Sequence, residues 1–250
     1  MLNDGRPQLQ RYYTDLASGL RRRADVFRAE LVGYFGGLAT RLSETEAERC
    51  AEQARAAPAF NVFEYLKQQG LDEIGLSRLL ANLLDPYGIH GQGDRFLNIF
   101  LRDIAKTEWA CGPETRIIRE DLTRFSHSPG RRIDITIHLG SRGIGVENKP
   151  WAGEGEDQIK DYKEHLARRY KGNFCLLYLS GSGDPPKSLS KSQRRMLSKR
   201  GKFRIVTYRE DLAEWIKSCQ EICPSDHVRW FLEDFHNYIQ DIFPAHAEDN

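Results

Sequence analysis

Two runs of alternating apolar and polar residues, separated by a glycine-rich turn, occupy residues 132–149. Alternation with a period of two on both sides of a short turn is typical of a β-hairpin with one buried face. The apolar face would carry isoleucines and a valine. The polar face would carry Asp134 from the first strand and Glu147 and Lys149 from the second. The pattern therefore predicts a sheet that brings two carboxylates and a lysine together.

If Ser141 and Arg142 form the turn, Asp134 lies opposite Lys149 and diagonal to Glu147. Diagonal neighbours in a sheet are about 7–8 Å apart, so two carboxylates can share one small cation. A bound Mg²⁺ can lower the pKa of a water ligand, and the lysine can position or deprotonate that water or stabilise negative charge. The alternative is an exposed hairpin face with an ordinary lysine–carboxylate pair.

A predicted helix over residues 156–170 follows the hairpin, with Gln158 and Tyr162 on one helical face. Together with the two acids and the lysine, this pattern resembles the PD-(D/E)XK nuclease superfamily, in particular members with a Gln-x-x-x-Tyr helix. The resemblance covers roughly residues 60–243 and indicates a branch of uncharacterised nucleases found mainly in bacteria. Upstream, it rests on Asn61–Glu64, Glu73–Pro86, His90–Gly93 and Phe96–Leu101.

The resemblance implies roles for individual residues. Asp134 and Glu147 would bind the metal, Mg²⁺ or Mn²⁺, and Lys149 would be the catalytic lysine. Glu73 would complete the metal site, with Glu64 and Asp72 as nearby alternatives. Gln158 and Tyr162 would support the site or contact the nucleic acid backbone. Ile133 stands where the superfamily's name places a proline.

The implied function is metal-dependent hydrolysis of phosphodiester bonds, in DNA rather than RNA, within a bacterial defence or DNA-processing system. One alternative is a catalytically silent module of the same fold that binds nucleic acid or a protein partner. Another is an effector whose activity needs a partner bound to residues 8–57. The sequence does not decide strandedness, endo- or exonuclease action, or oligomeric state.

The implied fold is α/β (α+β), with a mixed central sheet flanked by helices in a restriction-endonuclease-like αβββαβ core. We assign this core to residues 58–250 and an added helical hairpin to residues 1–57. The hairpin would have helices over residues 9–42 and 43–57. Gly36-Gly37 indicates a kink or end of the first helix, and the capping-box pattern Ser43–Glu46 indicates the start of the second. It would serve as a dimerisation arm, a partner-docking element or a lid.

The remaining core elements follow from local patterns. Helices are predicted at 60–69, 72–84, 94–109, 155–170, 189–200, 209–222 and 226–243. Strands are predicted at 115–125, 131–139, 143–149, 173–179 and 203–208.

Composition favours a soluble protein of a reducing compartment. The chain has 250 residues, a net charge of +1 and 29% charged residues, which argues against a histone-like mode of DNA binding. It has no apolar run of about 18 residues and no signal-peptide pattern. Five cysteines, an odd number, indicate free thiols. We therefore expect a cytoplasmic location and no membrane association.

A basic stretch follows residue 184 and contains no acidic residue before Glu210. Such stretches bind phosphates through salt-dependent contacts, although a solvated helix surface is the alternative. His90 lies in a glycine-rich loop. It would contact a phosphate or a metal-bound water, or alternatively form only a structural hydrogen bond. The residues predicted to contact nucleic acid are Lys187, Lys191, Arg194 and Arg195, together with Arg131 and Arg132 near the first strands.

Overall fold

The computed structural model describes residues 6–56, 63, 72–126, 130–151, 153 and 155–244, with the side chains of the first segment described for residues 9–49. The chain divides into two units, Met1–Phe60 and Asn61–Asn250, and each is described by itself. The predicted boundary at residues 57–58 and the alternative metal ligand Glu64 lie outside the described residues. So does the predicted helix 60–69, apart from Phe63.

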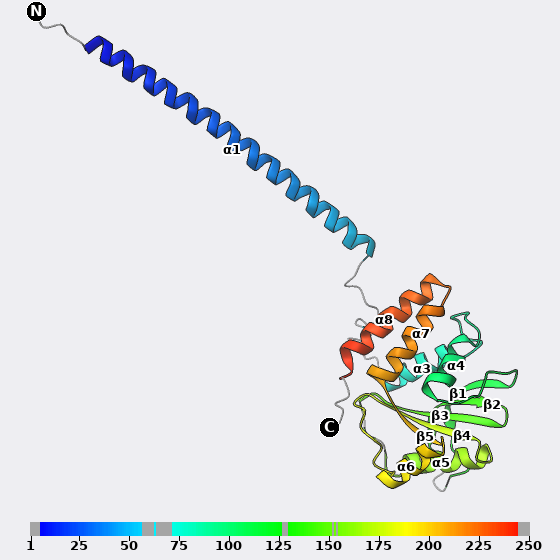
Figure 1. Cartoon of the computed structure of the whole chain (residues 1–250). Helices are drawn as coiled ribbons and strands as arrows, with labels where there is room; N and C mark the ends of the chain where they lie inside the picture. Colours follow the sequence, from blue (N-terminus) through cyan, green and yellow to red (C-terminus); the bar gives the residue numbers. More distant parts are fainter. Residues whose placement is uncertain are drawn as a thin grey trace, which may run out of the picture. The chain divides into compact units, whose positions relative to one another are not determined.

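The first unit contains one continuous helix, α1 (Arg6–Ala56), shown in blue in Figure 1. The predicted helical hairpin is therefore wrong. A glycine inside a helix costs only about 1 kcal/mol relative to alanine, and no proline stands between residues 9 and 49 to remove a backbone donor. In the proposed capping box, the Thr45 hydroxyl donates to the Arg41 carbonyl at 2.8 Å, a bond typical of a helix interior.

The second unit is built on one five-stranded sheet in the order β1-β2-β3-β4-β5. Strands β1, β2 and β3 are antiparallel, whereas the β3–β4 and β4–β5 pairs are parallel. This confirms the predicted mixed sheet. The strands are β1 (Thr115–Leu122), β2 (Arg132–Leu139), β3 (Arg142–Lys149), β4 (Phe174–Ser180) and β5 (Phe203–Thr207).

The β2–β3 turn differs from the prediction by one residue. Leu139 pairs with Arg142, so Gly140 and Ser141 form the turn. Gly140 has φ +65°, a backbone conformation that costs glycine little, and the chain therefore reverses one residue earlier than expected. The predicted pairing of Asp134 with Lys149 is wrong. Continued by one residue beyond Ile135–Val146, the observed register places Asp134 opposite Glu147.

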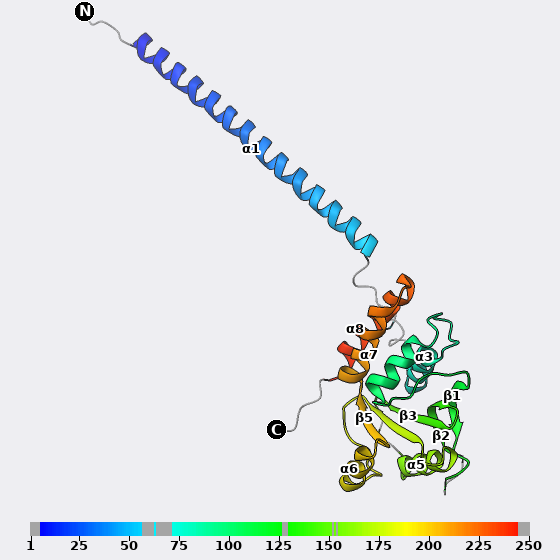
Figure 2. The same ribbon diagram turned by 45° about the vertical axis from the view of Figure 1, so that its right-hand side comes forward.

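Helices cover both faces of the sheet, as Figures 1 and 2 show. One face carries α5 (Gln158–Arg169) and α6 (Lys191–Lys199). The other carries α3 (Glu73–Leu84), α4 (Arg95–Ile99), α7 (Ala213–Ile222) and α8 (Asp226–Ile242), together with the short π-helical segments η1 (Phe100–Ile104) and η2 (Tyr208–Leu212).

The predicted helix 94–109 ends early, at Ile104. Its last turn closes with the Ala105 amide donating to Phe100 and the Thr107 amide donating to Leu101, both at 2.9 Å. Lys106 between them has φ +50°. A residue in this left-handed conformation commonly terminates a helix. Residues 106–112 therefore leave the helix and run toward β1.

Strand alternation divides the apolar residues into two layers. Ile144 and Val146 face the large core formed with α3, α4, α7 and α8. Leu176 and Tyr178 of β4 belong to a second core, beneath α5 and α6. The β3 side chains that face α5 are therefore covered by that helix, which shields polar groups among them from water. None of the described helices is both long enough and apolar enough to cross a membrane.

Candidate active site

Asp134 and Glu147 form a pair of carboxyl groups on neighbouring strands, in which Glu147 is fully buried and Asp134 partly buried. Asp134 accepts the backbone N–H of Asn148 at 2.7 Å, and burial raises its pKa to about 6. Glu147 is 0% exposed, and burial together with the Asp134 charge raises its pKa well above the usual range. Its Oε2 atom is buried and has no hydrogen-bond partner among the described residues. Two such groups cannot both be ionised cheaply unless a cation joins them.

Lys149 lies beside this pair at the end of β3. Its Nζ atom is 2.7 Å from Glu73 Oε1 and 2.9 Å from Glu147 Oε1, and its side chain is only 10% exposed. Burial by itself lowers the pKa of Lys149. The Glu147 charge and the hydrogen bonds to both glutamates outweigh burial, so the pKa is raised above its ordinary value. The lysine is therefore an ammonium at neutral pH, which favours charge stabilisation over the deprotonation of water.

Glu73 is the first residue of α3 and contacts the lysine. Its neighbour Asp72 is the N-cap of the same helix and accepts the Gly75 backbone N–H at 2.7 Å. Because that carboxylate is used in capping, Glu73 is the residue of this pair that reaches the site. The structure thus favours Glu73 over Asp72.

Gln158 and Tyr162 of α5 hold Glu147 in place. The Gln158 amide donates to Glu147 Oε1 at 2.6 Å and to the Tyr162 hydroxyl at 2.8 Å. That hydroxyl donates in turn to the Arg132 carbonyl at 2.5 Å. Tyr162 is 1% exposed, so its ring is closed off from the surface. Of the two predicted roles for these residues, this geometry favours support of the site over contact with a nucleic acid backbone.

Asn148, between the glutamate and the lysine, is a site residue that the sequence reasoning missed. Its side chain is 0% exposed. Its amide donates to Ser77 Oγ at 2.9 Å and to the Glu73 carbonyl at 3.4 Å, while its carbonyl accepts from the Tyr208 hydroxyl at 2.7 Å. An available signal was that Asn148 shares its parity with Ile144 and Val146, so an amide stood on the apolar face of the strand.

The carboxylates do not all converge. Among the described residues, no three histidine, cysteine or acidic side chains come close enough to hold one metal ion. The predicted set of Asp134, Glu147 and Glu73 is therefore not assembled, because Lys149 stands between Glu73 and Glu147. Asp134 and Glu147 do fit a divalent cation, since both are hard oxygen donors and Glu147 Oε2 is left without a partner.

His90 has a structural role in its loop. Its Nδ1 atom accepts the Gln92 backbone N–H at 3.0 Å, so the neutral ring carries its proton on Nε2, which lies 3.0 Å from the Asp85 carbonyl. The ring stacks on Phe96, with 5.1 Å between the ring centres. Both nitrogens are used, which favours the structural hydrogen-bonding reading.

The residues predicted to contact nucleic acid fall into separate places. Arg131 forms an ion pair with Asp161 at 2.9 Å and donates a hydrogen bond to the Glu156 carbonyl at 2.6 Å. Arg132 lies 3.4 Å from Glu120 and is 60% exposed. Lys187 is exposed but does not line a described groove. The structure brings together the other three: Lys191, Arg194 and Arg195.

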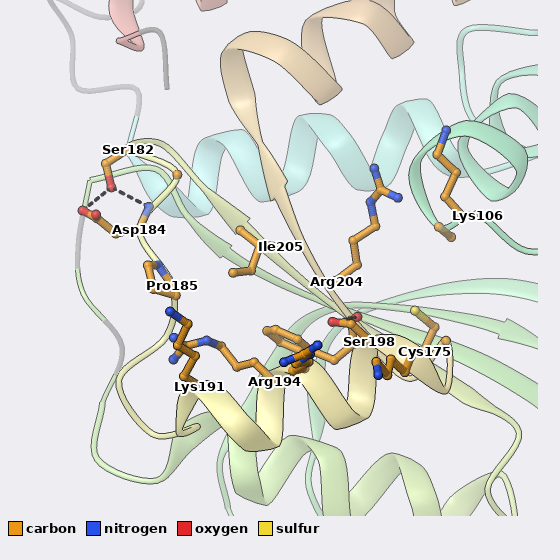
Figure 3. Close-up of a pocket in the computed structure, with 16 residues that line it drawn as sticks. Lys106, Cys175, Ser182, Asp184, Pro185, Lys191, Arg194, Ser198, Arg204 and Ile205 are labelled. Atoms are coloured by element: carbon orange, nitrogen blue, oxygen red, sulfur yellow. Dashed lines mark hydrogen bonds between the residues drawn. The ribbon is translucent and has the colours of Figure 1, made fainter. Parts of the chain in front are cut away.

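These three residues line a groove of about 1120 Å³ along the edge strand β5 (Figure 3). The groove also contains Lys106 from the segment after η1, Lys199 of α6 and Arg204 of β5. Among the described residues that line the groove, Asp184 is the single acidic one, and the Ser182 hydroxyl donates to it at 2.7 Å. The groove is therefore strongly cationic, which the basic stretch in the sequence indicated only in part.

The segment that leads into the groove starts beside the end of β3, the strand that carries Glu147 and Lys149. The Gly181 backbone N–H donates to the Lys149 carbonyl at 3.0 Å, and Ser182, Gly183 and Asp184 then run into the groove. A Cβ atom on Gly181 would stand 1.8 Å from the Pro150 carbonyl oxygen, so only glycine allows this close approach. The contact keeps this segment next to the end of β3 in the fold.

The chain is similar to known proteins over part of its length. A protein of Alcanivorax borkumensis named glutamate–cysteine ligase is 28% identical over 113 residues, which cover 43% of this chain and 20% of that protein. The chain thus spans about a fifth of the length of this curated relative. No solved structure matches. The family model described as "PD-(D/E)XK nuclease superfamily" matches residues 60–237, well over half of the chain, and the chain therefore belongs to that superfamily.

Proposed function

We propose that the protein is a divalent-metal-dependent nuclease that hydrolyses phosphodiester bonds, in DNA rather than RNA. The observation that carries the proposal is the pair of a partly buried Asp134 and a fully buried Glu147, whose Oε2 atom has no partner among the described residues and which has a lysine ammonium alongside. Buried like charges are costly, and structures keep them where a ligand or a reaction needs them. Membership of the superfamily supports the same reaction class.

In this proposal, Asp134 and Glu147 hold the cation, which would be Mg²⁺ or Mn²⁺. When bound, such an ion supplies a water of lowered pKa and neutralises charge on the phosphate oxygens. Lys149 places its ammonium where negative charge develops on the phosphate, and Glu73 orients that ammonium. Gln158 and Tyr162 fix the Glu147 carboxylate, so that little reorganisation is needed during reaction.

The cationic groove supports nucleic acid as the substrate. Lys191, Arg195 and Lys199 are exposed, and Lys106 and Arg204 line the groove from other elements, with Arg204 3.3 Å from Asp211. Phosphate backbones bind such arrays with little regard to sequence. Since the groove continues from the segment that contacts Lys149, a strand crossing the carboxylate pair would extend naturally into it. Lys187 and Arg132 are exposed cations that would add outlying contacts.

The test is cleavage of plasmid, linear duplex, single-stranded DNA and RNA, each with Mg²⁺, Mn²⁺ or EDTA. We expect wild type to cleave at least one DNA substrate with metal and none with EDTA. Asp134→Asn, which keeps the shape but removes a ligand charge, should reduce the rate by at least ~100-fold. Cleavage that persists in EDTA or in Asp134→Asn would contradict the proposal. Binding without cleavage by any form would favour the silent binding module instead.

Charge reversal in the groove should weaken substrate binding without affecting the carboxylates. In an Asp134→Asn background, Lys191→Glu with Arg195→Glu should reduce DNA affinity by at least ~10-fold at low salt. The slope of log affinity against log salt concentration should become shallower by about two, since two phosphate contacts are lost. The matched control is Arg95→Glu with Lys217→Glu, exposed residues of α4 and α7 that do not line the groove. Equal losses in the two double variants would mean that only net charge matters, and the groove would have no specific role.

A further inference from the structure

Helix α1 exposes an unusual amount of apolar surface for a helix in water. Tyr13, Leu20, Phe27 and Tyr34 are each 59–65% exposed. A helix gains most of its stability by packing one face against another element, and extended exposed apolar surfaces commonly mark interaction sites. The described part of α1, taken by itself, therefore carries an apolar surface suited to an interaction.

The exposed residues follow a coiled-coil repeat. Eight small or apolar residues of the helix are separated alternately by four and three residues, over four consecutive heptads. This spacing places them in one seam, whose alternate positions are called a and d. The seam consists of Ala17, Ala24, Leu31 and Leu38 at the a positions and Tyr13, Leu20, Phe27 and Tyr34 at the d positions. Other exposed apolar residues lie outside this spacing, including Tyr12, Leu16, Val26, Val32 and Phe35.

We propose that α1 pairs with α1 of a second copy of this chain as an antiparallel coiled coil, with Ala24 of one copy opposite Phe27 of the other. The same register sets Ala17 opposite Tyr34 and Leu20 opposite Leu31. The inner layers then combine a small residue with an aromatic one, or two leucines, and the outermost layer sets Tyr13 opposite Leu38. A parallel pair would instead set Ala17 against Ala17 and Ala24 against Ala24, and these thin layers would lie next to thick layers of Tyr13 and Phe27. Such uneven layers pack less well than the mixed layers of the antiparallel pair.

Charges beside the seam point the same way. In the antiparallel register, Arg23 lies opposite Glu30 of the partner copy, and this happens twice by symmetry. Arg21 then faces Arg28 on the other flank, where long exposed side chains can separate. A parallel pair would set Arg23 against Arg28 on both flanks and would form no ion pair with Glu30. Charge complementarity therefore selects the antiparallel second copy.

Sedimentation equilibrium of the full chain tests the pairing. We expect wild type at micromolar concentration to have twice the 28.8 kDa mass of one chain. Leu20→Lys with Leu31→Lys, which places two cations opposite each other in the seam, should weaken the dimer by at least ~100-fold. The control, Val26→Lys with Val32→Lys, adds the same charge at positions outside the seam that are 59% and 67% exposed.

A charge swap tests the orientation. Arg23→Glu and Glu30→Arg should each weaken the dimer by about fivefold, and the double variant should restore it. A parallel pair would instead be strengthened by Arg23→Glu, since the new glutamate would face Arg28. A monomeric wild type, a larger assembly, an equal loss in the valine control or a failure of the swap would each overturn the proposal. None of these outcomes depends on nuclease activity.

Discussion

Replacing Lys149 with methionine should reduce the cleavage rate by about 10²–10³-fold, an effect typical of removing one preorganised charge from a site. Methionine keeps much of the length and apolar contact of the lysine stem but removes the ammonium. In the wild type, this ammonium lies between Glu73 and Glu147 and has a raised pKa, so it remains charged at neutral pH. Its loss leaves the charge that develops on the phosphate without a cation from the protein.

The measurement is single-turnover cleavage with saturating metal, together with circular dichroism to check folding. Lys160→Met is the matched control, because that lysine lies on the exposed surface of α5. The control should cleave at the wild-type rate. If Lys149→Met also cleaves within threefold of that rate, the lysine has no part in the chemistry, and the proposed role is wrong.

The largest effect on stability is expected from Asn148→Ala. This change leaves the Tyr208 and Ser77 hydroxyls, both buried, without the amide that they contact. An unpaired buried polar group costs about 1–3 kcal/mol, so the free energy of unfolding should fall by about 3 kcal/mol. The backbone N–H that binds Asp134 is kept, and metal binding should therefore suffer less than stability.

A double-mutant cycle with Tyr208→Phe, measured by chemical denaturation, checks the reason for this loss. Tyr208→Phe alone removes a hydroxyl that donates to Asn148 at 2.7 Å and should cost about 1 kcal/mol. In the Asn148→Ala background the same change should cost nothing, because the hydroxyl no longer has that partner. Additive losses would show that Asn148 acts through packing alone.

The Lys149 prediction concerns the cleavage rate, whereas the Asn148 prediction concerns the stability of the fold around the site. Lys149 reaches Glu73, and Asn148 reaches Ser77 and Tyr208, so two neighbouring residues of β3 both contact helix α3. One of these contacts orients a charge, and the other fixes helix α3 against the strand that carries the carboxylate. Because α3 also supplies Glu73, the position of the ammonium depends indirectly on the buried amide.

The sequence by itself determined the strands, most of the helices and which charged residues share one face of the hairpin. These follow from local periodicity, which depends only on neighbours along the chain. Asp134, Glu147 and Lys149 share the polar parity of two short strands, and Gln158 and Tyr162 share a helical face. The order of the elements, together with the resemblance to the superfamily, was sufficient to predict a mixed sheet flanked by helices.

Only the tertiary structure decided which of these residues meet. The hairpin register depended on the positive φ of Gly140, which places Asp134 opposite Glu147 instead of Lys149. Glu73 contacts Lys149, which lies 76 positions further along the sequence. The structural role of Asn148 was recognised only from its contacts with α3 and η2. Glycines and a capping pattern also failed to divide α1, because their local preferences are small beside the continuity of a helix. Contacts between distant segments depend on turn geometry and packing, which local sequence patterns do not contain.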